Sequence, residues 1–228
     1  MITQIYSIQT AEEALDCINA GADRIGVAID TGVSLPAQVS EEKCKQIFDA
    51  IGTKAVKVLI AVTRSGEEVY GPLTRLQPEI IHICGNEYFA TPEFVKKAKE
   101  LCPGVKVLQA IAVTGPVAVD RAVYFAEFCD MLILDSVDPN IAGIGAAGIT
   151  HDWALDAEIV KKVACPVILA GGLGPENVAE AIRVVKPFGV DSFTKTSDKL
   201  PDGSSRKNPD KVRLFIQNAK AAAAELGL

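Results

Sequence analysis

The chain has 228 residues, of which 49% are hydrophobic and 23% charged, a balance typical of one globular domain with a well-filled core. Its formal net charge of -6 argues against nucleic acid or an anionic membrane as a partner, because both select basic surfaces. It does not exclude a small phosphorylated substrate, since backbone N–H groups bind phosphate without Lys or Arg.

The cysteines and the N-terminus indicate a cellular compartment. Six cysteines are scattered without a C-x-x-C pair, at positions 17, 44, 84, 102, 129 and 165. Scattered thiols favour a reducing environment over a disulfide framework. The N-terminus lacks the charged-then-apolar pattern of a leader, and no apolar run reaches about 18 residues. We therefore expect a cytoplasmic protein without a membrane segment, and the sequence leaves a monomer and a homodimer open.

Short apolar runs alternate with helical patterns along the whole chain. The runs predict eight strands, at residues 2–7, 22–29, 55–62, 79–83, 105–113, 131–135, 167–169 and 190–193. Each is followed by a predicted helix, and the helix starts are signalled by Thr10, Ser40, Gly66, Thr91, Pro116, Leu155, Pro175 and Pro209. Thr10 with Glu13 forms a capping-box pattern, in which the Thr side chain caps the first turn.

Eight strand–helix units in a chain of this length predict the α/β class and a closed (β/α)8 barrel, or TIM barrel. The linkers are short and none is rich in Pro, Gly or Ser, so one domain over residues 1–228 is expected. An open doubly wound sheet would show G-x-G-x-x-G after its first strand, and the residues after Ser7 lack this pattern.

The segment 166–178 has the pattern of an anion site. A buried strand leads into Gly171 and Gly172, which permit a sharp turn with uncovered N–H groups, and Pro175 suits a first helical position. Such amides beside a helix N-terminus bind phosphate. On the glycine pair alone an ordinary strand–helix turn fits equally well, but in barrels phosphate sits by the loops after strands seven and eight.

Catalytic groups in these barrels lie at the C-terminal ends of strands. Asp135 ends an apolar strand, where an acid is expensive unless it is used or paired; a helix cap or a salt bridge is the alternative. The glycine-rich loop that follows includes Gly145 and Gly148 and is flexible enough to cover a ligand.

Three further side chains could take part in chemistry. His82 and Cys84 lie two residues apart at the end of the fourth strand, hence on one face. A His there could act as a base, and a hydrogen-bonded histidine of the barrel is the alternative. Lys195 follows the eighth strand and could contact phosphate or form a Schiff base, although a solvated loop charge is the commoner case. The chain has only two histidines and no metal-ligand spacing, so neither a metal nor another cofactor is expected.

Taken in order, several segments resemble the phosphoribosylanthranilate isomerase family over nearly the whole chain. The strongest are 134–135 (Leu-Asp), 145–153 (Gly-Ala-Ala-Gly-Ile-Thr-His-Asp-Trp), 169–178 (Leu-Ala-Gly-Gly-Leu-Gly-Pro-Glu-Asn-Val) and 189–191 (Gly-Val-Asp). Weaker ones are 21–26, 85–87 and 207–212.

The resemblance implies an Amadori rearrangement of a phosphoribosyl amine, in tryptophan biosynthesis. It makes Asp135 the general acid on the ribose ring oxygen. It also assigns the phosphate to the turn at Gly171 and Gly172 and to a second turn at Thr194 and Lys195.

The departures from the family concern its base and its carboxylate-binding residue. The family begins with Ile-Cys-Gly, whereas this chain has Ile5, Tyr6 and Ser7, so the Cys base is replaced by a phenol with an ordinary pKa near 10. The family's Arg for the anthranilate carboxylate falls on Ala37. Its Gln-Leu-His-Gly becomes residues 82–85, and its Ser-Gly after strand eight becomes residues 194–195.

Three functions follow as hypotheses. The leading one is a sugar-phosphate isomerase acting on a substrate other than phosphoribosylanthranilate, with Asp135 as acid and His82 ahead of Tyr6 as the replacement base. The second is a lyase or aldolase that uses Lys195 as a Schiff-base amine. The third is a non-catalytic barrel that binds a phosphorylated ligand.

Overall fold

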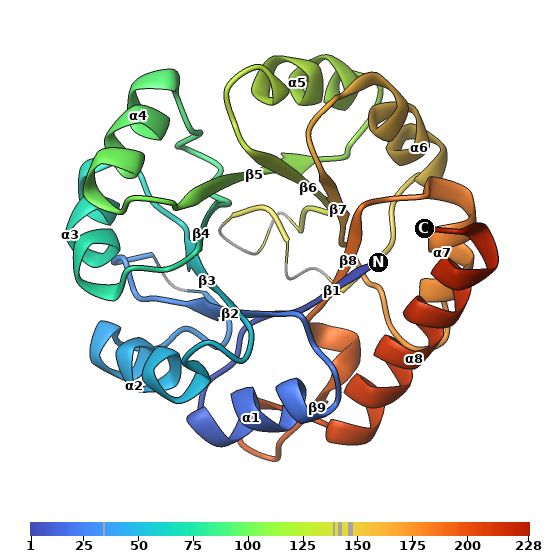
Figure 1. Ribbon diagram of the computed structural model, residues 1–228, viewed down its shortest axis with the longest axis horizontal. Helices are drawn as coiled ribbons and strands as arrows, with labels where there is room; N and C mark the ends of the chain where they lie inside the picture. The colour runs from blue at the N-terminus through green and yellow to red at the C-terminus, as the bar shows by residue number, and fades with distance from the viewer. Residues whose placement is uncertain (34, 139, 141–142, 146–147) are drawn as a thin grey trace.

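The computed structural model describes residues 1–228 except 34, 139, 141–142 and 146–147. Its centre is a closed barrel of eight parallel strands, each hydrogen-bonded to the next, with the eighth paired to the first (Figure 1). The strands are β1 (Ile2–Ile5), β2 (Arg24–Ala28), β3 (Val56–Ala61), β4 (Ile80–Ile83), β5 (Lys106–Ala112), β6 (Met131–Asp135), β7 (Val167–Leu169) and β8 (Gly189–Ser192). The predicted (β/α)8 barrel is confirmed.

Eight helices surround the barrel, one after each strand. They are α1 (Ala11–Asn19), α2 (Glu41–Ile51), α3 (Glu67–Leu76), α4 (Pro92–Leu101), α5 (Val117–Ala126), α6 (Trp153–Lys162), α7 (Val178–Val185) and α8 (Pro209–Leu226). Their starts follow the predicted caps closely: Thr10 Oγ1, for example, accepts from the Glu13 N–H at 3.1 Å. None of the helices in the described part of the chain has the length and apolar composition required to cross a membrane.

Two apolar clusters form the core. Side chains that point into the barrel, such as Ile60, Ile133 and Ile168, make the inner one. Their neighbours along the strands, such as Leu59 and Leu132, point outward and pack under the helices in the larger cluster. Because both faces of the strands are covered, strands such as β6 and β7 read as continuous apolar runs in the sequence.

The region after β7 and β8 differs from the sequence prediction. Helix α7 begins at Val178, not at Pro175, because the Asn177 side chain holds a turn: its Oδ1 accepts from the Gly174 N–H and its Nδ2 donates to the Gly172 carbonyl. After β8 come a 3₁₀ turn, Thr194–Thr196, and an unpredicted antiparallel hairpin of β9 (Ser197–Lys199) and β10 (Ser205–Lys207).

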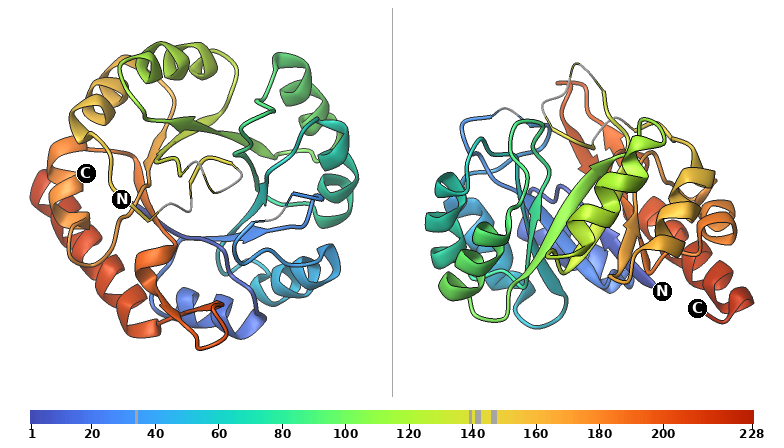
Figure 2. Two further views of the ribbon diagram at one scale, coloured as in Figure 1. Left: turned by 180° about the vertical axis from the view of Figure 1, so that it is seen from behind. Right: turned by 90° about the horizontal axis from the view of Figure 1, so that it is seen from above.

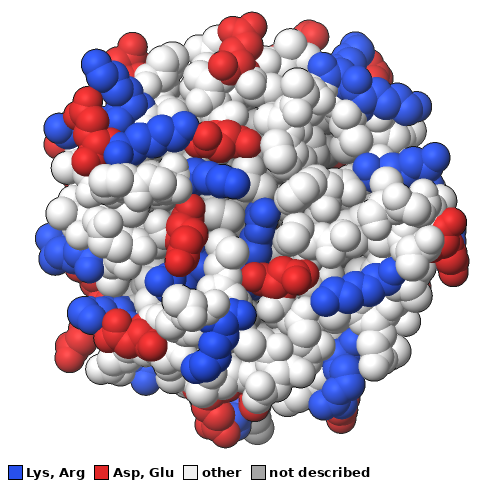
Figure 3. Space-filling model, in the orientation of Figure 1, with Lys and Arg blue, Asp and Glu red and all other residues white. Residues whose placement is uncertain are grey.

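The two ends of the barrel differ. Both chain termini lie at one end, and the described residues between β6 and α6 lie over the other end, where the strands finish (Figure 2). On the face shown in Figure 3, Lys and Arg side chains alternate with Asp and Glu, so no patch of a single sign forms there.

Candidate active site

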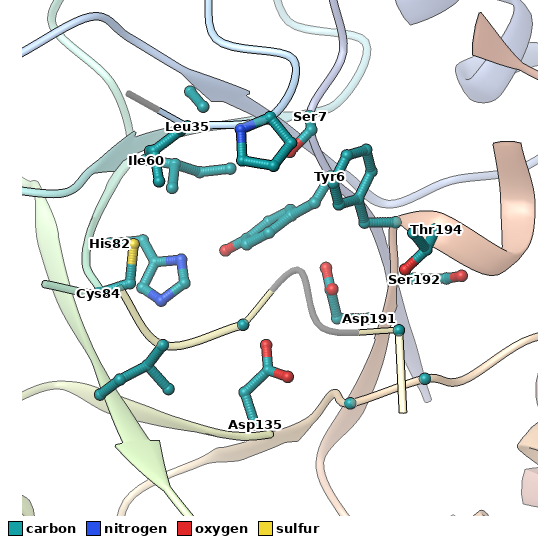
Figure 4. A pocket seen from close by; sticks show the side chains of 18 of the residues that line it. Tyr6, Ser7, Leu35, Ile60, His82, Cys84, Asp135, Asp191, Ser192 and Thr194 are labelled. Carbon is teal, nitrogen blue, oxygen red and sulfur yellow. The ribbon is translucent and has the colours of Figure 1, made fainter. Parts of the chain in front are cut away.

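A pocket of about 690 Å³, its open mouth included, lies at the end of the barrel where the strands finish (Figure 4). Its walls combine apolar side chains from β2, from β3 and from the loop after β2 with polar groups from the residues after β1 and from β4, β6 and β8. It is lined by Tyr6, Ser7, Ala28, Leu35, Pro36, Ile60, Val62, His82, Cys84, Asp135, Ile144, Gly145, Gly148, Gly171, Gly172, Leu173, Asp191, Ser192, Phe193 and Thr194.

Asp135 ends β6 and points its carboxyl group into this pocket (Figure 4). Its Oδ1 accepts a hydrogen bond from the Ser136 N–H at 2.7 Å. Burial raises the pKa of Asp135 to about 7, against the opposing effects of this hydrogen bond and of the nearby His151. A carboxyl group with such a pKa is partly protonated at neutral pH, which suits a general acid.

Tyr6 and His82 also face the pocket, with ring centroids 5.4 Å apart and the Tyr6 hydroxyl pointing toward the imidazole (Figure 4). Tyr6 crosses the barrel interior over Gly26, where a β-carbon would lie 2.2 Å from the Tyr6 ring. Burial raises the pKa of Tyr6 well above 10, and the charge of Asp191 adds to the effect. Burial lowers the pKa of His82 to about 3. At neutral pH the phenol is therefore protonated and the imidazole is neutral and weakly basic.

A second carboxyl group in the pocket, that of Asp191 on β8, was not singled out in the sequence. Gln4 lies beside it in register on β1 and donates from Nε2 to its Oδ1 at 3.2 Å. Burial raises the pKa of Asp191 well above its usual value, and the charge of Asp135 raises it further. The signal that could have found it is an acid inside the predicted strand 190–193.

The two predicted phosphate turns meet at one side of the pocket. Gly171 and Gly172 have φ angles of 81° and 61°, in the left-handed region that favours glycine. Thr194 lines the same pocket, whereas the Lys195 side chain is exposed and does not line it. Within the described chain, the N–H groups of Gly171, Gly172 and Thr194 donate to no backbone carbonyl. These three amides are therefore free to bind an anion.

Residues 148–150 of the loop after β6 lie against both turns. A β-carbon on Gly148 would be 2.9 Å from Thr194 Oγ1, and one on Gly172 would be 2.6 Å from the Ile149 carbonyl carbon. Gly145 and Gly148 both line the pocket, where the sequence analysis expected a covering loop.

His151 connects this loop to the end of β6 and to α6 through side-chain contacts. Its Nδ1 lies 3.1 Å from Ser136 Oγ, and its Nε2 lies 2.9 Å from the fully buried carboxylate of Asp156 in α6. The Ser136 hydroxyl donates its own proton to the Ile149 carbonyl, so it accepts from His151. The sequence predicted no partner for His151, since this network depends on contacts that only the fold creates.

No three His, Cys, Asp or Glu side chains cluster tightly enough to hold a metal ion in the part of the chain that the structure describes. The six cysteines are free thiols. The pocket thus brings together two carboxyl groups, a phenol, an imidazole and a set of free amides.

Comparison with known proteins identifies the family. The family model described as N-(5'phosphoribosyl)anthranilate (PRA) isomerase matches residues 3–218. The N-(5'-phosphoribosyl)anthranilate isomerase of Methanocella arvoryzae is 34% identical over 217 residues, covering 95% of this chain and 97% of that protein.

Solved structures agree with the sequence match. Phosphoribosyl anthranilate isomerase from Thermotoga maritima superimposes with a TM-score of 0.80 at 28% identity, over 97% of this chain and 100% of that one. Another, in complex with reduced 1-(o-carboxyphenylamino)-1-deoxyribulose 5-phosphate, has a TM-score of 0.77 at 26% identity, with the same coverage. With the barrel and its pocket, these matches show that the chain belongs to the phosphoribosylanthranilate isomerase family.

Proposed function

We propose that this protein is a sugar-phosphate isomerase that converts a phosphorylated aldosyl amine into the corresponding 1-amino-1-deoxyketose phosphate. The observation that carries the proposal is the carboxyl group of Asp135, which faces the pocket with a pKa raised by burial to about 7. Membership of the family supports the same reaction type. Asp135 gives its proton to the ring oxygen, and the ring opens to an iminium ion.

The next step needs a base that removes the proton from C2, so that an enolamine forms. Reprotonation at C1 with loss of the C2 hydroxyl proton then gives the ketose. Tyr6 and His82 remain predictions for this base, but their pKa values give them little support. Burial raises the pKa of Tyr6, so that the phenol keeps its proton, and lowers the pKa of His82, so that the imidazole is a weak base.

We propose Asp191 as the base instead. It lies on β8, the strand that pairs with β1, and the family's Cys would come directly after β1, at Tyr6. Asp135 and Asp191 line one pocket, and the charge of an ionised Asp135 raises the pKa of Asp191, so the pair favours a state with one proton, in which one carboxyl group is an acid and the other a carboxylate base. The amide of Gln4 favours the ionised form at Asp191.

The phosphate of the substrate is assigned to the space between the Gly171–Gly172 turn and Thr194. Free N–H groups on both sides support this assignment, because they donate to an anion without needing a basic side chain. The backbone of Lys195 is part of the same 3₁₀ turn, but its exposed amine gives no support to the Schiff-base alternative.

The substituent on the substrate nitrogen is proposed to be uncharged. No Lys or Arg is among the described residues that line the pocket, and its wall after β2 is formed by Leu35 and Pro36. The position of the family's Arg is Ala37. An anthranilate carboxylate would therefore enter this pocket without a cationic partner, at a desolvation cost. The names of the relatives favour anthranilate, so a substrate with the carboxylate and one without it have to be compared directly.

The test compares two synthetic substrates that differ only in the carboxylate: N-(5-phosphoribosyl)anthranilate and N-(5-phosphoribosyl)aniline, with turnover followed by proton NMR. We expect a kcat/KM for the aniline compound at least equal to that for anthranilate, and no rescue of a tryptophan auxotroph that lacks the isomerase. Preference for anthranilate by about a hundredfold would overturn the substrate proposal. Absence of turnover on both compounds would overturn the isomerase proposal and leave the hypothesis of a non-catalytic barrel that binds a phosphorylated ligand.

A further inference from the structure

Lys207, the last residue of β10, carries a buried amine outside the pocket. The residue is only 6% exposed. Its Nζ donates to the Phe193 carbonyl at 2.8 Å and to Ser197 Oγ at 3.0 Å, and it lies 4.7 Å from the centroid of the Phe193 ring. A charged group is rarely buried unless its position is used, so these contacts call for a function.

The backbone of Lys207 is held as firmly as its side chain. Its N–H donates to Glu13 Oε1 at 2.9 Å, and the other oxygen of this carboxylate accepts from the Gln9 N–H at 2.9 Å. Lys207 also pairs with Ser197 across the hairpin. The hairpin and α1 together therefore place the amine against the turn that follows β8.

The contact with Phe193 fixes the direction of the next amide. In a planar trans peptide the C=O and the following N–H point in opposite directions. Because the Phe193 carbonyl points at Lys207, the Thr194 N–H points away from it, on the side where Phe193 and Thr194 line the pocket. This N–H is one of the three free amides assigned above to the phosphate.

We propose that Lys207 is a positioning residue for phosphate binding: it orients the Phe193–Thr194 peptide toward the anion and places a buried positive charge behind it. The proposal rests on the phosphate assignment made under the proposed function. It explains how a pocket with no Lys or Arg among its described lining residues still favours a dianion. The amine acts through the peptide and does not itself reach the pocket.

The charges around the amine determine how it titrates. Burial lowers the pKa of Lys207 to about 8, and three neighbours oppose this effect: Cys17 and Glu13 of α1 and Asp191 of β8. The small surface depression beside Lys207 also contains Asp16, Asp198 and Arg206. Loss of the proton above about pH 8 removes the charge behind the phosphate, so anion affinity should fall there.

The test measures binding of ribose 5-phosphate by isothermal titration calorimetry. We expect K207M to weaken binding by about tenfold at neutral pH, since it removes one buried charge and the peptide contact. The control is K199M, on the exposed strand of the same hairpin, which should bind like the wild type. Thr196 and Ser197 still donate to the Phe193 carbonyl in K207M, so the turn keeps two of its contacts.

A pH series separates positioning from a merely structural role. Wild-type affinity should show a step near pH 8 that K207M lacks, while titration of Asp135, whose pKa does not depend on Lys207, affects both proteins alike. The proposal would be overturned if K207M bound ribose 5-phosphate as tightly as the wild type does, or if the affinity of the wild type showed no step near pH 8. The second measurement needs only the wild type, so it tests the proposal even if K207M fails to fold. A wild type that binds no ribose 5-phosphate at all would instead refute the phosphate assignment.

Discussion

Gly145 lies so close to Asp135 that a β-carbon at this glycine would be 2.6 Å from Asp135 Oδ2. The loop after β6 therefore covers the acid directly, and any side chain larger than hydrogen must displace one of the two. This contact connects the glycine-rich loop with the chemistry of the pocket.

We accordingly expect Gly145→Ala to lower kcat by at least about tenfold, because a small displacement of a catalytic group is costly. The control is Gly203→Ala. Gly203 also has a positive φ, 85°, but a β-carbon there would meet no atom within 4 Å. Both variants carry backbone strain and only the first carries the clash, so equal activities in a steady-state assay would show that the loop does not position Asp135.

The acid itself gives the second prediction. Asp135→Asn should lower turnover by at least about a hundredfold with the fold intact, as expected for loss of a general acid. The pH profile of the wild type gives an independent check. Since the pKa of Asp135 is raised to about 7 and the acid must be protonated, kcat should fall above neutral pH by about tenfold per pH unit. A rate that stays flat up to about pH 9 would assign the acid role elsewhere.

The same carboxyl group should lower the stability of the protein at high pH. Its folded-state pKa of about 7 exceeds the usual value of 3.8, so its stabilising contribution is complete below about pH 4 and is lost as the pH rises through 7. Asp135→Asn abolishes this titration. We expect the variant to be more stable than the wild type at about pH 8.5, by on the order of 1–3 kcal/mol, with no advantage at about pH 4. Urea denaturation at both pH values measures the difference.

The features that the sequence predicted are those set by residues close together in the chain. The strands and helices were predictable because apolar periodicity is local, and β6 and β7 begin and end at the predicted residues. Asp135 and the glycine turn were predictable because their positions relative to a strand end define them. The hairpin of β9 and β10 was not, since its short polar strands carry no apolar pattern.

The electrostatics of the site were beyond the sequence for a different reason. The expectation that His82 titrates near neutral pH assumed a solvated ring, whereas its ring is buried beside Tyr6. Lys207 and Glu13 are bonded although 194 residues separate them. Such contacts exist only after the barrel closes, so no local pattern reports them.

The His151–Asp156 pair gives a prediction about stability. Asp156 is fully buried, and removal of His151 leaves its carboxylate without this partner. We expect His151→Ala to cost about 3 kcal/mol, and the double variant with Asp156→Ala to lose less than the sum of the single losses, with a coupling of about 1–3 kcal/mol. The control cycle uses Glu158 and Lys162, an exposed pair in α6, whose coupling should stay below about 0.5 kcal/mol. Equal couplings in the two cycles would mean that the buried pair does not fasten the loop.

Ser7 carries the last prediction, because it has a φ of 60° in the region that favours glycine. The family has glycine at this position, and a residue with a β-carbon pays a steric penalty there of about 1–2 kcal/mol. Ser7→Gly should relieve this strain but increases the freedom of the unfolded chain, so we expect a net stabilisation of about 0.5–1 kcal/mol in urea denaturation. Ser40→Gly is the control: its φ of -64° is unstrained and its hydroxyl caps α2, so that change should stabilise nothing.

Residues with a strained backbone occur most often at functional sites, and Ser7 lines the pocket next to Tyr6 in the chain. We therefore expect Ser7→Gly to raise KM for the substrate several-fold while it stabilises the protein. A variant that gains stability and keeps the wild-type KM would show that the serine hydroxyl does not contact the substrate. A variant that loses stability would show that the Ser7 side chain stabilises the folded protein by more than the strain of its backbone destabilises it.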